Sequence, residues 1–156
     1  MREILYRAKL DPRFIVAPIT SEWVEGSYIH QTRFYGDPVD KHWILTDGEF
    51  DYDYYEAERV LPETIGQFTG FYDYNGKRIF EGDILDRRCP RKHWSNRMYV
   101  SWCRGSFILQ DFDENEDFLS NWCNTAYRNG EDVGGCYVIG NIHDNPELLK
   151  ETMKGE

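Results

Sequence analysis

Short runs of apolar residues, or of alternating apolar and polar residues, are separated by Gly, Asn and Asp along most of the chain. Such runs predict short β-strands joined by turns, whereas the period of an amphipathic helix is scarce. The predicted strands span residues 4–10, 23–24 with 28–30, 42–46, 59–61, 67–73, 77–80, 83–86, 98–103, 106–110 and 136–142. This density of short strands predicts a mainly β fold.

Two turns and two short helices complete the predicted elements. Asn75-Gly76 lies between aromatic and branched residues, which is the strongest short signal for a β-hairpin. Arg104-Gly105 marks a second hairpin. Helix is predicted only over 116–127 and in the tail, where Asn145 is the expected N-cap and Pro146 the first helical residue.

Length and composition are typical of a folded domain. The 156 residues suffice to bury a core without disulfides, and an aromatic fraction of 16% compensates for a hydrophobic fraction of 40%. No stretch approaches the ~18–20 apolar residues of a membrane-spanning helix. Arg2, Glu3 and Arg7 interrupt any apolar run at the N-terminus, which argues against a signal peptide. We therefore expect a cytoplasmic protein that does not bind a membrane.

The charge is acidic on average but basic in one segment. Lys and Arg number 18 against 28 Asp and Glu, a net charge of −10, which disfavours general attraction to nucleic acid. Residues 87–97 nevertheless hold five basic residues and no acidic one. The candidate interaction patch comprises Arg87, Arg88, Arg91, Lys92 and Trp94. Cations beside a Trp suit a loop that tracks phosphates and stacks bases, and they equally suit a solvated loop or a contact with an acidic subunit surface.

Motifs that would carry catalysis or bind a metal are absent or incomplete. The chain has no G-x-S-x-G, P-loop, G-x-G-x-x-G or H-E-x-x-H sequence. Asp111 begins a run like a calcium loop, but Glu116 and Trp122 occupy the positions where an EF-hand needs Gly and Glu. Cys89 and His93 lack the paired spacing of a zinc site. We therefore expect no catalytic residue, no bound metal and no cofactor, and we expect the four cysteines to be reduced thiols.

Two long motifs resemble those of a known family. The first is LPETIGQFTG at 61–70, which runs into DYNGK at 73–77 and IFEGDI at 79–84. The second is CYVIGNIHDNPELL at 136–149. Together, in this order, they resemble the signature and the closing motif of the YopX family of phage and prophage proteins. The resemblance extends over about residues 1–150.

This resemblance implies a fold and a division of the chain. The family is known for a small SH3-like barrel flanked by further strands, so a barrel core is expected over 61–150, with segments 87–97 and 111–135 as insertions. Residues 1–60 would add N-terminal strands that pack on the barrel, and 151–156 would form a tail. All of these parts are expected to make one structural unit, mainly β with short helices.

The function that the resemblance implies is less specific than the fold. The family has no established activity, catalytic residues or cofactor, so we expect a non-enzymatic bacteriophage or prophage protein in the bacterial cytoplasm that contacts a host or phage protein. Many aromatic residues and segments of opposite charge also favour a homo-oligomer. The alternative is nucleic-acid binding through the basic loop 87–97, which the net charge disfavours.

Overall fold

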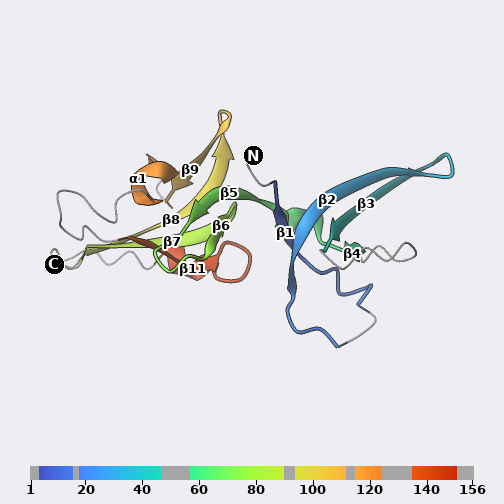
Figure 1. Cartoon of the computed structure of the whole chain (residues 1–156), viewed down its shortest axis with the longest axis horizontal. Helices are drawn as coiled ribbons and strands as arrows, with labels where there is room; N and C mark the ends of the chain where they lie inside the picture. The colour runs from blue at the N-terminus through green and yellow to red at the C-terminus, as the bar shows by residue number, and fades with distance from the viewer. Residues whose placement is uncertain are drawn as a thin grey trace. The chain divides into compact units, whose positions relative to one another are not determined.

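Antiparallel strands dominate the computed structural model, which describes residues 4–15, 18–46, 57–89, 94–111, 115–123 and 135–150 (Figure 1). The prediction of a mainly β fold is confirmed. Within the described ranges, no helix is both long and apolar enough to cross a membrane.

The chain divides into two units, Met1–Phe68 and Thr69–Glu156. The boundary between these units lies within strand β5 (Gly66–Tyr72). The division of the chain after residue 60, within one structural unit, stays a prediction. The packing of the N-terminal strands on a barrel stays a prediction. The tail 151–156 lies outside the described residues.

The first unit is an antiparallel sheet around a small core. Its elements are β1 (Tyr6–Lys9), β2 (Trp23–Phe34), β3 (Asp37–Leu45), β4 (Ala57–Arg59), the 3₁₀ turn η1 (Pro62–Thr64) and the start of β5. The strand order is β4-β3-β2-β1-β5. Strand β5 also pairs with β6 (Arg78–Phe80), which belongs to the second unit. Ala8, Ile44 and Val60 form the buried centre of the first unit.

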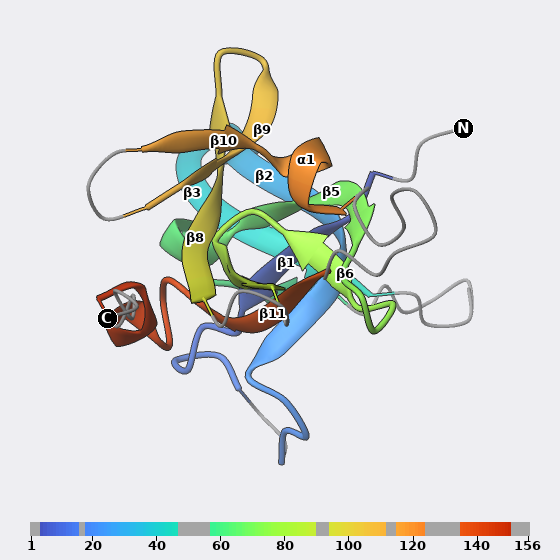
Figure 2. The ribbon, with the colours of Figure 1, turned by 90° about the vertical axis from the view of Figure 1, so that its left-hand side faces the viewer.

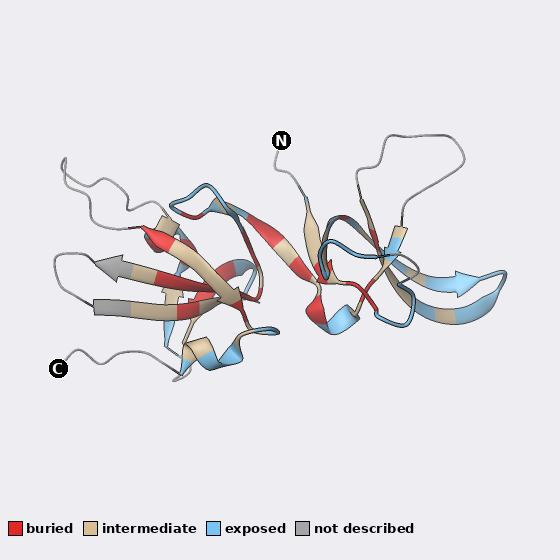
Figure 3. Cartoon of the chain, turned by 90° about the horizontal axis from the view of Figure 1, so that it is seen from below, coloured by how far each residue is buried: buried red, intermediate tan, exposed pale blue. Residues whose placement is uncertain are grey.

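Strand β2 has different neighbours along its length. Its first part pairs with β1, from Lys9↔Trp23 to Tyr6↔Gly26, and its second part pairs with β3, from Ser27↔Leu45 to Phe34↔Asp37. The sequence predicted two shorter strands here and missed the turn at Tyr35-Gly36 that joins β2 to β3. Figure 3 shows this end of the hairpin as mostly exposed.

Gly26 stands where β2 passes from one neighbour to the other. A Cβ atom at this position would lie 1.8 Å from the carbonyl oxygen of Leu45 and 2.7 Å from its carbonyl carbon. Only a residue without a side chain permits this approach of two backbones.

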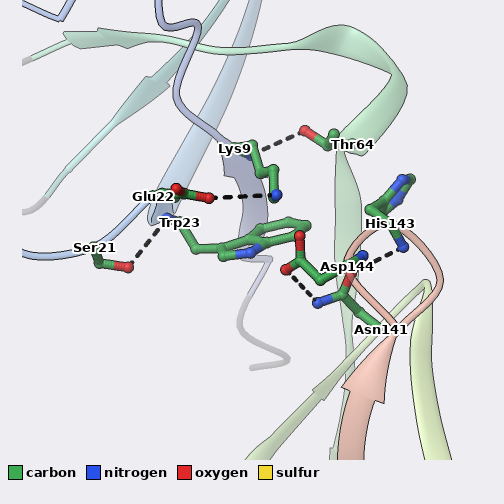
Figure 4. Close-up of polar contacts among 8 residues, drawn as sticks. All are labelled: Lys9, Ser21, Glu22, Trp23, Thr64, Asn141, His143 and Asp144. Carbon is green, nitrogen blue, oxygen red and sulfur yellow. Dashed lines mark hydrogen bonds and ion pairs between the residues drawn. The ribbon is translucent and has the colours of Figure 1, made fainter. Parts of the chain in front are cut away.

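Lys9 connects three segments of the first unit (Figure 4). Its backbone N–H donates to Thr64 Oγ1 at 2.9 Å, and its Nζ lies 3.4 Å from Glu22 Oε2. Thr64 in turn donates to the carbonyl oxygen of Leu61 at 2.7 Å. The LPET sequence of the family motif therefore forms a turn that is held against β1.

The second unit contains a five-stranded antiparallel sheet in the order β10-β9-β8-β7-β11. Figure 2 shows β10, β9, β8 and β11 of this sheet. Its elements, besides the end of β5 and β6, are β7 (Asp83–Cys89), β8 (Trp94–Cys103), β9 (Ser106–Gln110), β10 (Glu116–Phe118), α1 (Leu119–Cys123), β11 (Cys136–Asn141) and the 3₁₀ turn η2 (Pro146–Leu149). Side chains from β6, β7, β8, β9, α1 and β11 share one core, in which Trp122 and Leu109 are almost fully buried.

Asp73 joins the two family motifs. Its Oδ1 accepts from the N–H groups of Asn75 and Lys77 at 2.8 and 2.9 Å, and its Oδ2 accepts from the N–H of Val138 at 3.1 Å. The predicted hairpin around Asn75-Gly76 is confirmed. The connection between its strands is longer than two residues, and the hydrogen bonds to Asp73 hold it in place.

Asn141 organises the closing motif in a similar way (Figure 4). Its Oδ1 accepts from the N–H groups of His143 and Asp144, both at 2.9 Å, and its Nδ2 donates to Asp144 Oδ2 at 2.9 Å. Asn145 was predicted to cap a helix through its side chain, but it makes no such bond and the turn that follows is 3₁₀.

The SH3-like barrel stays a prediction, because no closed barrel is detected among the described strands. Two further predictions need correction. The predicted helix over 116–127 begins as strand β10, which pairs with β9, and becomes helical only at Leu119–Cys123, with 124–127 outside the described residues. The basic segment 87–97 was predicted as a loop, but residues 87–89 and 94–97 are strand, since β7 and β8 pair from Arg87↔Asn96 to Cys89↔Trp94, while 90–93 lie outside the described residues.

Candidate functional site

The predicted basic patch is only partly placed by the structure. Arg91 and Lys92 lie outside the described residues, and for Arg88 and Trp94 only the backbone, in β7 and β8, is described. The guanidinium carbon of Arg87 lies 5.7 Å from the ring centre of Trp122, in the second unit's own core. Arg87 is therefore the one patch residue whose side chain is described, and it lies against its own unit.

Asp117 lies beside Arg87 and Trp122. Its Oδ2 accepts from Trp122 Nε1 at 2.8 Å and its Oδ1 from Asn121 Nδ2 at 2.9 Å. Burial raises the pKa of Asp117, but these hydrogen bonds, with one from its neighbour's backbone and the charge of Arg87, outweigh burial and leave the pKa below the usual value. Asp117 therefore stabilises the fold in its ionised form.

We expect Asp117→Asn to lower the free energy of unfolding at pH 7 by about 1 kcal/mol, because a hydrogen-bonded charge is lost from a partly exposed site. A carboxyl group whose pKa is depressed on folding contributes stability above its unfolded pKa of about 4, and the contribution vanishes as the pH falls through its folded pKa. Urea unfolding from pH 7 down to pH 2 should therefore show the two proteins converging below pH 4. A difference that stays constant over this range would contradict the assignment.

A second cluster lies on the β2–β3 hairpin of the first unit. The cross-strand pair His30↔His42 places the two imidazoles face to face, with ring centres 4.4 Å apart and planes within 10°. His30 Nε2 lies 2.7 Å and His42 Nε2 lies 3.1 Å from the same oxygen, Oδ1 of Asp40. The hydrogen bond to His30, opposed by partial burial, holds the pKa of Asp40 below its usual range.

Tyr28 fixes the other side of His42. Its hydroxyl lies 2.7 Å from His42 Nδ1, and its ring packs 5.4 Å from that of Tyr6 in β1. Burial raises the pKa of Tyr28, with Asp40 adding to the effect, so the phenol stays protonated at neutral pH. His42 is the most enclosed member of the cluster, with 14% of its side chain exposed against 42% for His30.

Sequence reasoning missed this cluster because it depends on the register of the hairpin. Asp40 and His42 are two apart and so share one face of a strand, which the sequence does show. His30 joins them only through the turn at Tyr35-Gly36, and this pair lacks the Asn-Gly signal of a tight hairpin. Once the turn is recognised, the antiparallel register places position 30 opposite position 42.

Two thiols approach each other in the second unit. Cys123 Sγ, in α1, and Cys136 Sγ, in β11, are 3.8 Å apart, well beyond a disulfide bond. The hydrogen bond to Cys136 and burial raise the pKa of Cys123. Cys103, Cys123 and Cys136 are all free thiols, while the side chain of Cys89 lies outside the described part.

The end of the β2–β3 hairpin presents aromatic side chains to solvent. Tyr35 is 95% exposed and Phe34 is 51% exposed, with their rings in edge contact at 4.6 Å. Lys41 Nζ lies 5.1 Å from the ring centre of Phe34. This aromatic end, defined by Phe34 and Tyr35, is the most exposed large apolar surface on the hairpin.

Comparison with known proteins identifies a family and a similar crystal structure. The family model for YopX protein matches residues 19–150. The chain is also similar to the crystal structure of protein EF1440 from Enterococcus faecalis, with 25% sequence identity, a TM-score of 0.54, and coverage of 96% of this chain and 99% of that chain. No curated protein matches the chain. The structural similarity extends over both units.

Proposed function

Because the chain belongs to the YopX family, and because its β2–β3 hairpin presents an exposed aromatic end, we propose that it is a phage- or prophage-encoded protein that acts through protein–protein contacts rather than catalysis. Its place of action would be the cytoplasm of the bacterial host. The contact surface is the aromatic end of the hairpin.

The backbone at Tyr35 carries this proposal. Tyr35 has φ of 49° and Gly36 has φ of 95°, as in a turn with both central residues in the left-handed region. Asn or Gly adopts this conformation readily, whereas a bulky residue there costs about 1 kcal/mol or more. Apart from its edge contact with Phe34, this large and almost fully exposed ring gains little from the fold, so a contact with a partner is the better reason for its presence in a strained position.

The charge of the hairpin end also suits a protein partner. Residues 31–41 hold two basic and two acidic residues, Arg33 and Lys41 against Asp37 and Asp40, so they are neutral in a chain of net charge −10. Aromatic residues are enriched in protein interfaces. A second copy of this chain is the first partner to test, and a host or phage protein is the next.

We expect Tyr35→Asn to stabilise the protein by about 1 kcal/mol, because Asn tolerates the left-handed conformation, and at the same time to abolish self-association. Sedimentation velocity at several concentrations measures the association, and urea unfolding measures the stability. Arg104→Asn is the matched control, because Arg104 and Gly105 have φ of 50° and 80° in the β8–β9 turn.

The control should gain similar stability and associate as the wild type does. A Tyr35→Asn protein that associates normally would refute the role of the aromatic end. If the wild type is monomeric, photo-crosslinking from position 35 in infected cells should capture a host or phage protein, and failure to capture one would refute the proposal.

Nucleic-acid binding through Arg87, Arg88, Arg91, Lys92 and Trp94 is the alternative. The observation in its favour is that Arg87 and Arg88 in β7 and Trp94 in β8 lie on two paired strands, where Cys89 is opposite Trp94. A salt titration of single-stranded and duplex DNA and RNA, repeated with the four basic residues changed to Ala, separates the two functions. Tight binding near physiological salt that the variant loses would favour nucleic acid over protein contacts.

We also infer that the second unit derives from an SH3-like barrel. The support is a set of bonds that connect its two parts: Gly82 N–H donates to the carbonyl oxygen of Val100 at 2.8 Å, and Tyr74 N–H donates to that of Cys136 at 3.0 Å. The β5–β6 hairpin and the β7–β8–β9 strands share one core, as the halves of a small barrel do.

A further inference from the structure

We propose that His30, Asp40 and His42 form a binding site for a divalent transition-metal ion of the zinc type. The three side chains come from the two strands of one hairpin, and their ligand atoms all lie within 4.8 Å of one another. The proposal is independent of the protein contacts proposed above.

The positions of the ligand atoms are close to those of a metal site. Both imidazoles direct Nε2 toward one carboxylate oxygen, at 2.7 and 3.1 Å. Ligands about 2.0–2.2 Å from a tetrahedral zinc ion are about 3.3–3.5 Å from each other. Asp40 must therefore withdraw only slightly for an ion to enter, and its side chain is free to do so because it is 79% exposed.

Tyr28 supplies the outer partner that a histidine ligand requires. A histidine that binds a metal through Nε2 carries its proton on Nδ1, and a hydrogen-bond partner there fixes both the tautomer and the ring orientation. The Tyr28 hydroxyl, 2.7 Å from Nδ1 of His42, can accept that bond. His42 is therefore held in place before an ion binds, whereas the more exposed His30 can adjust.

The type of ligand selects the ion. Two imidazoles and one carboxylate suit Zn²⁺ and its neighbours Co²⁺, Ni²⁺ and Fe²⁺, whereas Mg²⁺ and Ca²⁺ prefer a shell of oxygen atoms. Three protein ligands leave at least one coordination position open. His30 and Asp40, the more exposed members of the cluster, keep the site accessible to solvent.

A bound ion would cross-link the hairpin at the His30↔His42 pair. This pair lies in the middle of the hairpin, between the pair Ser27↔Leu45 and the turn at Tyr35-Gly36. The ion would join the two strands without involving the second unit. Because an ion that binds only the folded hairpin stabilises it, the melting temperature should rise with ion concentration.

The test is a chelator-competition titration with Zn²⁺, together with Co²⁺ spectra. We expect one ion per chain in the wild type and a loss of at least tenfold in affinity for both Asp40→Ala and His30→Gln. Both of these residues are exposed, so the variants should keep the fold, which circular dichroism checks. Tyr28→Phe should weaken binding about tenfold while leaving the ligands in place.

Three controls make the outcome decisive. His143→Gln alters an exposed histidine of the second unit and should bind as the wild type does. Mg²⁺ and Ca²⁺ should not raise the melting temperature, and the Co²⁺ spectrum should lack the charge-transfer band of a thiolate ligand. Equal Zn²⁺ affinity in the wild type, Asp40→Ala and His30→Gln would overturn the proposal, as would a thiolate band.

Discussion

Gly26→Ala is expected to disrupt the first unit, with a loss of about 3 kcal/mol in the free energy of unfolding. The added methyl group would lie 1.8 Å from the carbonyl oxygen of Leu45, and backbone cannot move aside as a flexible side chain can. To make room, β2 and β3 must separate at the point where Ser27 pairs with Leu45.

Urea unfolding followed by circular dichroism measures this loss, and Gly36→Ala serves as the control. Gly36 has φ of 95° but nothing within 4 Å of an added Cβ, so its substitution costs only the backbone strain, about 1 kcal/mol. Equal effects of the two substitutions would show that the close approach at Gly26 does not matter.

Asp73→Ala is expected to destabilise the second unit by roughly 3 kcal/mol, because three backbone N–H groups lose their acceptor at a buried position. Two of these groups belong to the turn that Asn75 and Lys77 form, and the third is that of Val138 in β11. The substitution therefore weakens the hairpin and its connection to the closing motif together.

Asp73→Asn separates the two effects. The amide oxygen can still accept from the turn, but the amide nitrogen then faces the N–H of Val138, so we expect an intermediate loss. Asp144→Ala is the control, since Asp144 is exposed and its loss should cost less than about 1 kcal/mol. Urea unfolding of the four proteins should give free energies of unfolding that decrease in the order wild type, Asp144→Ala, Asp73→Asn, Asp73→Ala.

Most strands could be predicted because they follow local patterns. Ser106–Gln110 was predicted at its observed bounds, and the Arg104-Gly105 turn before it has the two positive φ angles of a tight hairpin. The YopX resemblance is likewise confirmed by the match over residues 19–150. In these cases a few neighbouring residues are enough to make the prediction.

The features that were missed depend on residues far apart in the sequence. The bond from Val138 to Asp73 spans 65 residues, so the turn residues of the first motif gave no sign of it. The thiols of Cys123 and Cys136 meet through packing of α1 against β11, which has no local signal. The segment 87–97 was predicted as a loop because it holds five basic residues and no acidic one, but in its described parts, 87–89 and 94–97, strand pairing overrides this preference.

The change of neighbours along β2 has a consequence for local opening. Beyond the pair of Trp43 with Arg59 in β4 and the hydrogen bond from the Val60 N–H to the carbonyl oxygen of His42, the strand pairs of Ile29–Phe34 join them only to the facing strand of the hairpin within the described chain. A two-stranded ribbon is marginally stable on its own, so its amide hydrogens should exchange with solvent much faster than those of Tyr6–Lys9. Slow exchange of these amides would then indicate a bound ligand. An ion at His30 and His42 would protect the amides in the middle of the hairpin, whereas a protein bound at Tyr35 would protect those at the turn.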